Sequence, residues 1–301
     1  MACAALFSTG GAAIKACSLS GWQVAGIRSA VAALAIAILL PESRRVRDLR
    51  VVLLAAAYAA TLVLFVRATK LTTAASAIFL QSVAPLYVLL LGHWLLGERV
   101  RRGDLGYMAA FALGLAFLLS GSPVPVASAP DPALGNRLAA ASGVTYALTL
   151  VGFRYLRADP GAGASSLVVG NVLAAAASLP FALPLPRIGM ADLAVVGYLG
   201  IVQIGLAYLL LTRGMRHVPA LEASLLLLVE PVLNPIWAWI LQKEVPEAAS
   251  IVGGAVILVT TGLMTSRGGN VTTHEGNERG HDGGSGAGGA RHADRAGGGP
   301  V

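Results

Sequence analysis

The chain has 301 residues, of which 56% are apolar and 12% charged, and its mean hydropathy is +0.72. A soluble protein of this size carries roughly 25% charged residues, so the composition excludes an ordinary water-soluble globular protein. The apolar residues occur in runs of about 16 to 24, and each run is long enough to cross a hydrocarbon core of roughly 30 Å as a helix. We therefore predict an all-α polytopic membrane protein surrounded by lipid.

The formal net charge of +7 does not indicate a nucleic-acid partner, because the arginines form short clusters between the apolar runs. Such clusters are typical of cytoplasmic loops. The two cysteines, Cys3 and Cys17, lie in the same apolar run. A disulfide would require a break in that helix, so we assign both cysteines to packing.

Ten apolar segments are predicted to span the membrane as two sets of five. The first segment has no basic stretch before it and no clear cleavage site, which favours a membrane helix over a removable signal peptide. The first set is 1–19, 22–40, 51–66, 72–96 and 104–121. The second set is 135–155, 163–183, 190–212, 219–241 and 246–265.

The same pattern predicts the domain organisation. A first unit at 1–121 and a second unit at 135–266 are separated by a linker at 122–134, whose four prolines cannot continue a helix. The tail at 267–301 is glycine-rich and hydrophilic, so we expect it to be disordered. Its three histidines have irregular spacing and no neighbouring cysteine, and we predict no metal site there.

An internal repeat supports this division. Residues 67–98 align with residues 213–244 without a gap at an offset of 146, and eight of the 32 aligned positions are identical. The matched positions that are rare or costly in an apolar run are Arg67 with Arg213, Pro85 with Pro231, and Glu98 with Glu244. We infer a duplicated membrane unit. Because each unit has an odd number of helices, the second is predicted to insert upside down relative to the first.

Basic residues in the predicted loops indicate the orientation. If the N-terminus is cytoplasmic, the inner loops hold twelve Lys and Arg residues and the outer loops hold six. This excess favours both termini in the cytoplasm. Inverted repeats of this kind form a site at the midplane that opens alternately to either side.

The repeated stretches resemble a known family. Each has a fourth helix of small residues, a proline within it and a closing glutamate, and Arg28 lies where the family's second helix usually carries an arginine. These features resemble the EamA repeats of the drug/metabolite transporter superfamily over residues 1–266. The residues that carry the resemblance are Ala74-Ala75-Ser76 through Pro85 to Leu95-Leu96-Gly97-Glu98-Arg99, and Ala223-Ser224 through Glu230-Pro231 to Glu244.

The resemblance implies a ten-helix carrier of the inner (plasma) membrane. Many relatives of this kind export amino acids, other metabolites or drugs. Two features depart from the pattern: the first helix is short, and the second unit ends in Leu241-Gln242-Lys243-Glu244, where the family more often has Leu-Gly-Glu. The second departure concerns a local turn.

Glu230 is the first candidate for a functional side chain. It lies near the middle of the ninth segment beside Pro231, and neutral Ala84 occupies the matching position of the first unit. An ionised carboxylate at this depth costs several kcal/mol unless it is paired. Glu230 is either a group that binds a substrate amine or a proton, or a protonated or backbone-bonded carboxyl that accommodates a proline kink.

Two further charged residues lie inside predicted helices. Glu222, eight residues before Glu230, is either a second binding carboxyl or, as we favour, a first-turn acid stabilised by the helix dipole. Arg28 in the second segment either neutralises a carboxylate of the substrate or of Glu230, or extends to the interface or into a structural pair.

Several uncharged residues are candidates on weaker grounds. Asn171 in the seventh segment either hydrogen-bonds a substrate or joins two helices. Pro85 and Pro231 each free a backbone carbonyl one turn earlier, which either contacts substrate or marks a fixed packing kink. The remaining polar candidates for the cavity are Gln81, Gln203, Tyr208 and Asn234.

We predict a secondary carrier for a small organic molecule. Phosphate-binding loops, His-Glu-x-x-His and Gly-x-Ser-x-Gly are absent from the sequence, so we predict no enzyme activity, cofactor or metal. Protons as the coupling ion and a homodimer are both compatible with the sequence. The alternative is a structural or receptor-like membrane protein without transport activity, which requires no polar cavity containing Glu230 and Arg28.

Overall fold

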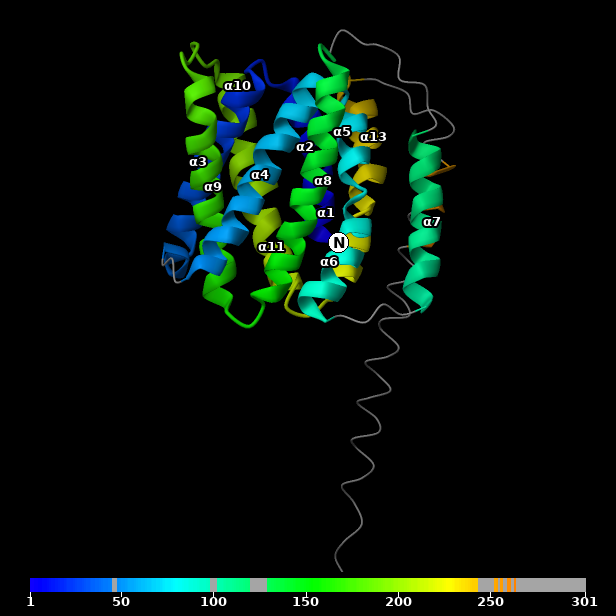
Figure 1. Cartoon of the computed structure of the whole chain (residues 1–301). Helices are drawn as coiled ribbons and strands as arrows, with labels where there is room; N and C mark the ends of the chain where they lie inside the picture. Colours follow the sequence, from blue (N-terminus) through cyan, green and yellow to red (C-terminus); the bar gives the residue numbers. More distant parts are fainter. Residues whose placement is uncertain are drawn as a thin grey trace, which may run out of the picture. The chain divides into compact units, whose positions relative to one another are not determined.

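The computed structural model describes residues 1–44, 48–97, 102–119 and 129–242, together with 252–253, 255–256, 259–260 and 263. The helices described below belong to one compact unit, Met1–Thr261. All regular elements in these ranges are helical, as predicted (Figure 1). Glu98, Glu244, most of the linker at 122–134, most of the tenth segment and the tail lie outside the described residues.

The first half of the chain contains eight described elements. They are α1 (Ala2–Ser8), α2 (Gly10–Ala16), α3 (Gly21–Leu39), the 3₁₀ turn η1 (Pro41–Arg44), α4 (Leu49–Leu71), α5 (Ala74–Gln81), α6 (Ala84–Leu96) and α7 (Arg102–Leu119).

The second half begins at α8 (Pro132–Tyr155). It continues with α9 (Pro160–Ala182), α10 (Met190–Tyr198), the π-helix η2 (Leu199–Leu206), α11 (Ala207–Gly214), α12 (Ala220–Leu226) and α13 (Val229–Gln242).

Side-chain caps explain where several helices begin. Ser20 and Gln23 form a reciprocal capping box before α3, and the Thr73 hydroxyl accepts a 3.0 Å hydrogen bond from the Ser76 N–H at the start of α5. Asp131 caps α8, and Pro132 occupies its first position, where a missing N–H costs little. α8, which corresponds to the sixth predicted segment, therefore starts three residues before the predicted boundary at 135 and includes the end of the predicted linker.

The fourth and ninth predicted segments are each interrupted by two residues outside the α-helices, close to the prolines where we predict kinks. α5 ends at Gln81 and α6 begins at Ala84, while α12 ends at Leu226 and α13 begins at Val229. The two prolines, Pro85 and Pro231, lie in the first turns of α6 and α13. Proline cannot donate the hydrogen bond that a helix interior requires, but its cost is small in a first turn.

The eighth predicted segment differs in another way. It contains the π-helix η2 between α10 and α11, with Gly200 placed against α3. A mainly apolar sequence can adopt either α or π winding, so a hydropathy pattern cannot predict the π-helix. π-Helical turns are frequent at functional sites.

Hydrogen bonds between helix ends define two sides of the bundle. Lys15 Nζ donates to the Thr72 carbonyl at 2.7 Å, and Thr72 Oγ1 donates to Asn136 Oδ1 at 2.9 Å. The ends of α2 and α4 and the start of α8 therefore share one side. Arg154 Nη1 donates to the Met215 carbonyl at 3.0 Å, which places the ends of α8 and α11 on the other side.

The matching broken helices consequently run in opposite directions. α5 starts beside the beginning of α8, whereas α12 starts after α11, on the side where α8 ends (Figure 1). Packing between the halves is reciprocal as well: α4 packs on α9, and η2 packs on α3. In each case the third segment of one half contacts the second segment of the other.

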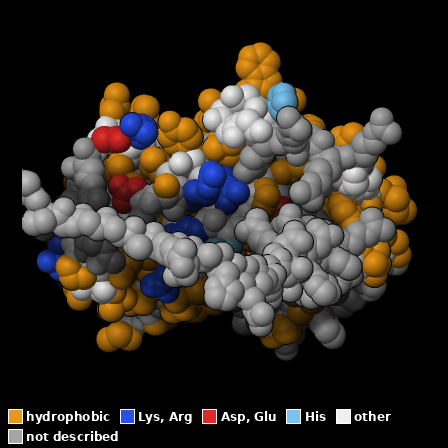
Figure 2. All heavy atoms as spheres, turned by 90° about the horizontal axis from the view of Figure 1, so that it is seen from below, with side chains coloured by type: hydrophobic (Ala, Val, Ile, Leu, Met, Phe, Trp, Pro, Cys, Tyr) orange, Lys and Arg blue, Asp and Glu red, His pale blue; other side chains and the backbone are white. Residues whose placement is uncertain are grey.

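Basic side chains gather on the side where α8 and α11 end. Figure 2 views the molecule from below and shows Lys and Arg side chains between apolar ones on this face. The exposed arginines at this side are Arg44, Arg50, Arg157, Arg213 and Arg216.

The outward surfaces of the helices are apolar. Within the described ranges, five helical stretches are long and apolar enough to cross a membrane: Gly21–Leu39, Leu49–Leu71, Ala74–Leu96, Gly161–Ala182 and Met190–Gly214. Half or fewer of the residues in each are buried inside the protein, and Leu34, Leu53 and Phe181 are 63%, 62% and 61% exposed. Such surfaces are unfavourable in water and suited to lipid. The chain is therefore a multi-pass membrane protein.

A glycine substitution tests the contact between η2 and α3. A Cβ at Gly200 would lie 2.7 Å from the Arg28 carbonyl oxygen and 2.8 Å from the Val31 side chain, whereas a Cβ at Gly197 would have nothing within 4 Å. We expect Gly200→Ala to destabilise the protein by about 1–3 kcal/mol and Gly197→Ala to leave stability nearly unchanged. Thermal unfolding of the purified variants in detergent measures both. Equal melting temperatures would contradict the close packing.

Candidate functional site

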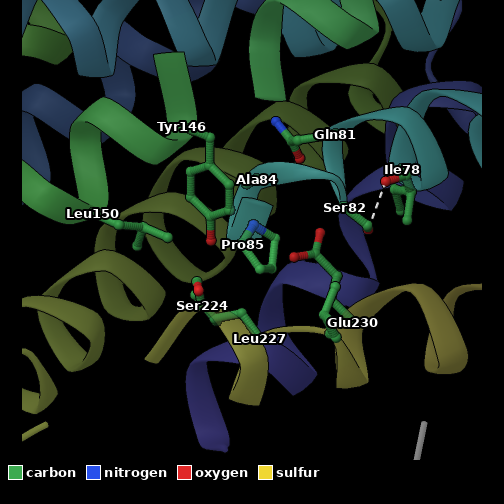
Figure 3. A pocket seen from close by; sticks show the side chains of 11 residues that line it. Ile78, Gln81, Ser82, Ala84, Pro85, Tyr146, Leu150, Ser224, Leu227 and Glu230 are labelled. Atoms are coloured by element: carbon green, nitrogen blue, oxygen red, sulfur yellow. Dashed lines mark hydrogen bonds between the residues drawn. The ribbon is translucent and has the colours of Figure 1, made fainter. Parts of the chain in front are cut away.

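Two adjoining pockets lie between the two halves of the chain. The first lies where α8 meets the breaks in the two broken helices, and we call it the break chamber (Figure 3). We call the second the arginine chamber because Arg28 lines it. Gln81, Tyr146 and Glu230 line both chambers. One polar cavity is thus bounded by helices of both halves.

Glu230 lies on the wall shared by the two chambers. It is the second residue of α13 rather than a mid-helix residue, and the first turn of a helix favours a carboxylate through the helix dipole. Its side chain is 9% exposed, and its carboxyl group points into the break chamber (Figure 3). Among the described residues the carboxyl group makes no hydrogen bond or ion pair.

Arg28 enters the cavity from α3. It is 1% exposed, so its guanidinium lies inside the protein and does not extend to the membrane interface. Nη2 donates to the Leu62 carbonyl at 3.1 Å, and Nη1 donates weakly to Gln203 Oε1 at 3.4 Å. Nε has no partner in the described part of the chain, where no ion pair joins Arg28 to Glu230. A guanidinium with an unused donor is suited to an acceptor that enters the cavity.

Gln81 and Tyr208 also line the cavity. Gln81 Nε2 donates to Ser142 Oγ on α8 at 3.2 Å. The Tyr208 ring packs edge-on against Tyr58, with 4.5 Å between centroids, and against Phe7 at 4.8 Å. The arginine chamber therefore combines a guanidinium with aromatic and amide walls.

Most of the other candidates lie outside both chambers, although Gln203 lines the arginine chamber. Asn171 is fully buried, and its Nδ2 donates to Tyr58 Oη on α4 at 3.1 Å, which joins two helices. Asn234 is 2% exposed and packs against Gly11 of α2. Glu222 is in the first turn of α12, as the dipole interpretation expects. Pro85 lines the break chamber, whereas Pro231 lines neither chamber.

Tyr146 is a lining residue of both chambers that the sequence analysis missed. It is 7% exposed, and its hydroxyl has no hydrogen-bond partner in the described part of the protein. The signal in the sequence was a tyrosine in the middle of the sixth apolar segment. Helical periodicity could not show that this side chain lines the same chambers as Glu230, because the two residues belong to helices that are distant in sequence.

These observations define a multi-pass helical membrane protein whose two related halves enclose a buried polar cavity. The model of the EamA-like transporter family matches residues 1–120 and 133–266. The chain belongs to this family, and it is a membrane transporter of the drug/metabolite transporter type. The match covers both halves, so the two repeats inferred from the sequence are EamA repeats.

The fold is also found in solved structures. One crystal structure of a protein is 20% identical in sequence, with a TM-score of 0.69, and the match covers 88% of this chain and 95% of the other. At this identity the likeness supports the fold alone. A search of curated proteins found no match.

A double-mutant cycle tests the contact between Asn171 and Tyr58. We expect Tyr58→Phe and Asn171→Ala each to destabilise the protein, with a coupling free energy of about 0.6 kcal/mol, typical of interhelical hydrogen bonds in membranes. Unfolding of the two single variants and the double variant measures the coupling. Strictly additive effects would show that the hydrogen bond contributes nothing. Loss of transport in folded Asn171→Ala protein would instead favour a role in substrate binding.

Proposed function

We propose that this protein is a secondary carrier that exports a small organic metabolite, such as an amino acid, a related compound or a drug, by alternating access. The observation that carries this proposal is the polar cavity bounded by both repeats, with Glu230 and Arg28 on its walls. The structural or receptor-like alternative requires no such cavity.

The proposed architecture is ten membrane helices in two inverted five-helix repeats. The units are 1–121 and 135–266, joined by the linker at 122–134 and followed by a cytoplasmic tail at 267–301. The opposite directions of α5 and α12 support the inversion, and their equivalent breaks support the repeat. Reciprocal packing between the repeats suits a rocking motion about a central site.

The proposed location is the inner (plasma) membrane. The proposed orientation places both termini in the cytoplasm. The arginines at the side where α8 ends support this, because basic residues are enriched in cytoplasmic loops. The sequence has no ATP-hydrolysing motif, so export uses an ion gradient or the substrate's own gradient. Glu230 is the candidate site for a coupled proton.

Transport by matched carboxyl variants tests the proposed site. Substrates are first identified by a thermal-shift screen of the purified protein against amino acids, nucleosides, sugars and drugs, because a ligand of the folded state raises the melting temperature. We then expect Glu230→Gln to abolish transport of the hit in proteoliposomes while preserving expression. Glu222→Gln, which neutralises a carboxyl outside both chambers, is the control and should transport normally. Near-normal transport by Glu230→Gln would overturn the role of Glu230.

Single cysteines test the orientation. In a background that lacks Cys3 and Cys17, we expect Arg187→Cys to react with a membrane-impermeant thiol reagent in intact cells. Arg157→Cys should react only after the cells are permeabilised, because it lies at the opposite side of the bundle. The reverse labelling pattern would place the termini outside.

A further inference from the structure

We propose that the break chamber is an ammonium subsite, in which the Glu230 carboxylate, Gln81 Oε1 and Tyr146 Oη receive the cationic end of an amine-bearing substrate. This inference rests on the proposed carrier function and narrows the substrate class. It assigns a direct binding role to Tyr146 and specifies which atom of Gln81 meets the substrate.

The two serine hydroxyls that line the break chamber already use their hydrogens. Ser82 Oγ donates to the Ile78 carbonyl at 2.7 Å, and Ser224 Oγ donates to the Leu221 carbonyl at 2.6 Å. A serine hydroxyl has one hydrogen to donate, so both oxygens can offer only lone pairs to a ligand. These two sides of the chamber therefore accept hydrogen bonds and cannot donate them.

The Gln81 amide is oriented by its neighbour on α8. Ser142 Oγ gives its hydrogen to the Ala139 carbonyl at 2.7 Å and can only accept from Gln81, which requires the amide nitrogen to face Ser142. The amide oxygen is then the atom left for a ligand. Figure 3 shows this oxygen on the chamber side, with the nitrogen turned away.

Tyr146 and Glu230 complete the set of acceptors. The Tyr146 hydroxyl is buried without a partner, although buried polar groups in proteins are nearly always hydrogen-bonded. The Glu230 carboxyl group points into the same chamber (Figure 3). The residues that line the break chamber include no Lys, Arg or His, so none of them supplies a counter-charge to Glu230.

A ligand that satisfies this chamber must donate several hydrogen bonds and carry positive charge. A primary ammonium has three donors and no acceptor, and its bond to a carboxylate is charge-assisted. A carboxylate or phosphate would find one free side-chain donor there, the Tyr146 hydroxyl, beside the negatively charged Glu230 and the Gln81 amide oxygen. In the adjoining arginine chamber, Arg28 offers a positive charge and an unused Nε donor, so that chamber favours a ligand group that accepts hydrogen bonds and carries negative charge. The ammonium end of a substrate is thus directed to the helix breaks.

Thermal shift of the purified full-length chain with matched probes tests this assignment. The probes are butylamine and 2-phenylethylamine, each compared with its alcohol, 1-butanol or 2-phenylethanol, and with butyrate. We expect both amines to raise the melting temperature and the alcohols and butyrate to leave it unchanged. Glu230→Gln should abolish the shift.

Tyr146→Phe is the second variant, because it keeps the buried ring if Glu230→Gln folds poorly. Loss of one hydrogen bond to a charged group should weaken amine binding about tenfold or more. Tyr107→Phe is the matched control, because its buried hydroxyl also lacks a partner among the described residues but α7 lines neither chamber. This variant should bind the amines like the unmodified protein.

The assignment is overturned if no amine stabilises the protein, if the alcohols stabilise it equally, or if Tyr146→Phe and Glu230→Gln bind amines normally. Uptake of labelled metabolites into proteoliposomes distinguishes this failure from failure of the carrier function. Transport of anions or neutral metabolites without amine binding would retain the carrier and reject the subsite. Amine binding that depends on Glu230 and Tyr146, without transport of any metabolite or amine, would retain the subsite and reject the carrier.

Discussion

The absence of bulk water inside a bilayer is the constraint on which this structure depends. A polar group at that depth must find a partner within the protein or face a cavity. Asn171 illustrates the first outcome, because its amide joins α9 to α4 through Tyr58. Glu230 illustrates the second, because its carboxyl group has no partner among the described residues and points into the break chamber. A polar group without a partner is thus a candidate for binding a ligand where it also lines a cavity, as Glu230 does.

The equivalent breaks in the fourth segment of each repeat form part of the wall of the polar cavity. Pro85 and Pro231 make an uninterrupted helix unfavourable, so the chain ends one helix and begins another. In the second repeat the new helix begins next to Glu230, where the helix dipole stabilises a negative charge. The first repeat has Ala84 at this position. The two repeats therefore share the break, whereas only the second carries the charge.

Gly200 shows how the same packing also positions the guanidinium. Gly200 has no side chain, and a Cβ there would collide with the backbone of α3. Because this space is free, η2 approaches α3 closely enough for Gln203 to contact Arg28. The Leu62 carbonyl on α4 holds the other end of the guanidinium. Helices α3 and α4 of the first repeat and η2 of the second thus position the Arg28 guanidinium in the cavity. The negative charge of the cavity is the Glu230 carboxylate, which points into the break chamber.

The sequence by itself determined the membrane class, the repeat and its matched prolines, and six residues of the cavity: Glu230, Arg28, Gln81, Gln203, Tyr208 and Pro85. These follow from local physics, since the length of an apolar run and the cost of a charge or proline within it are properties of one segment. Only the tertiary structure decided that Tyr146 and Glu230 line the same chambers while Asn171 and Asn234 lie elsewhere. Which polar side chains meet depends on how helices distant in sequence pack, and no single segment contains that information.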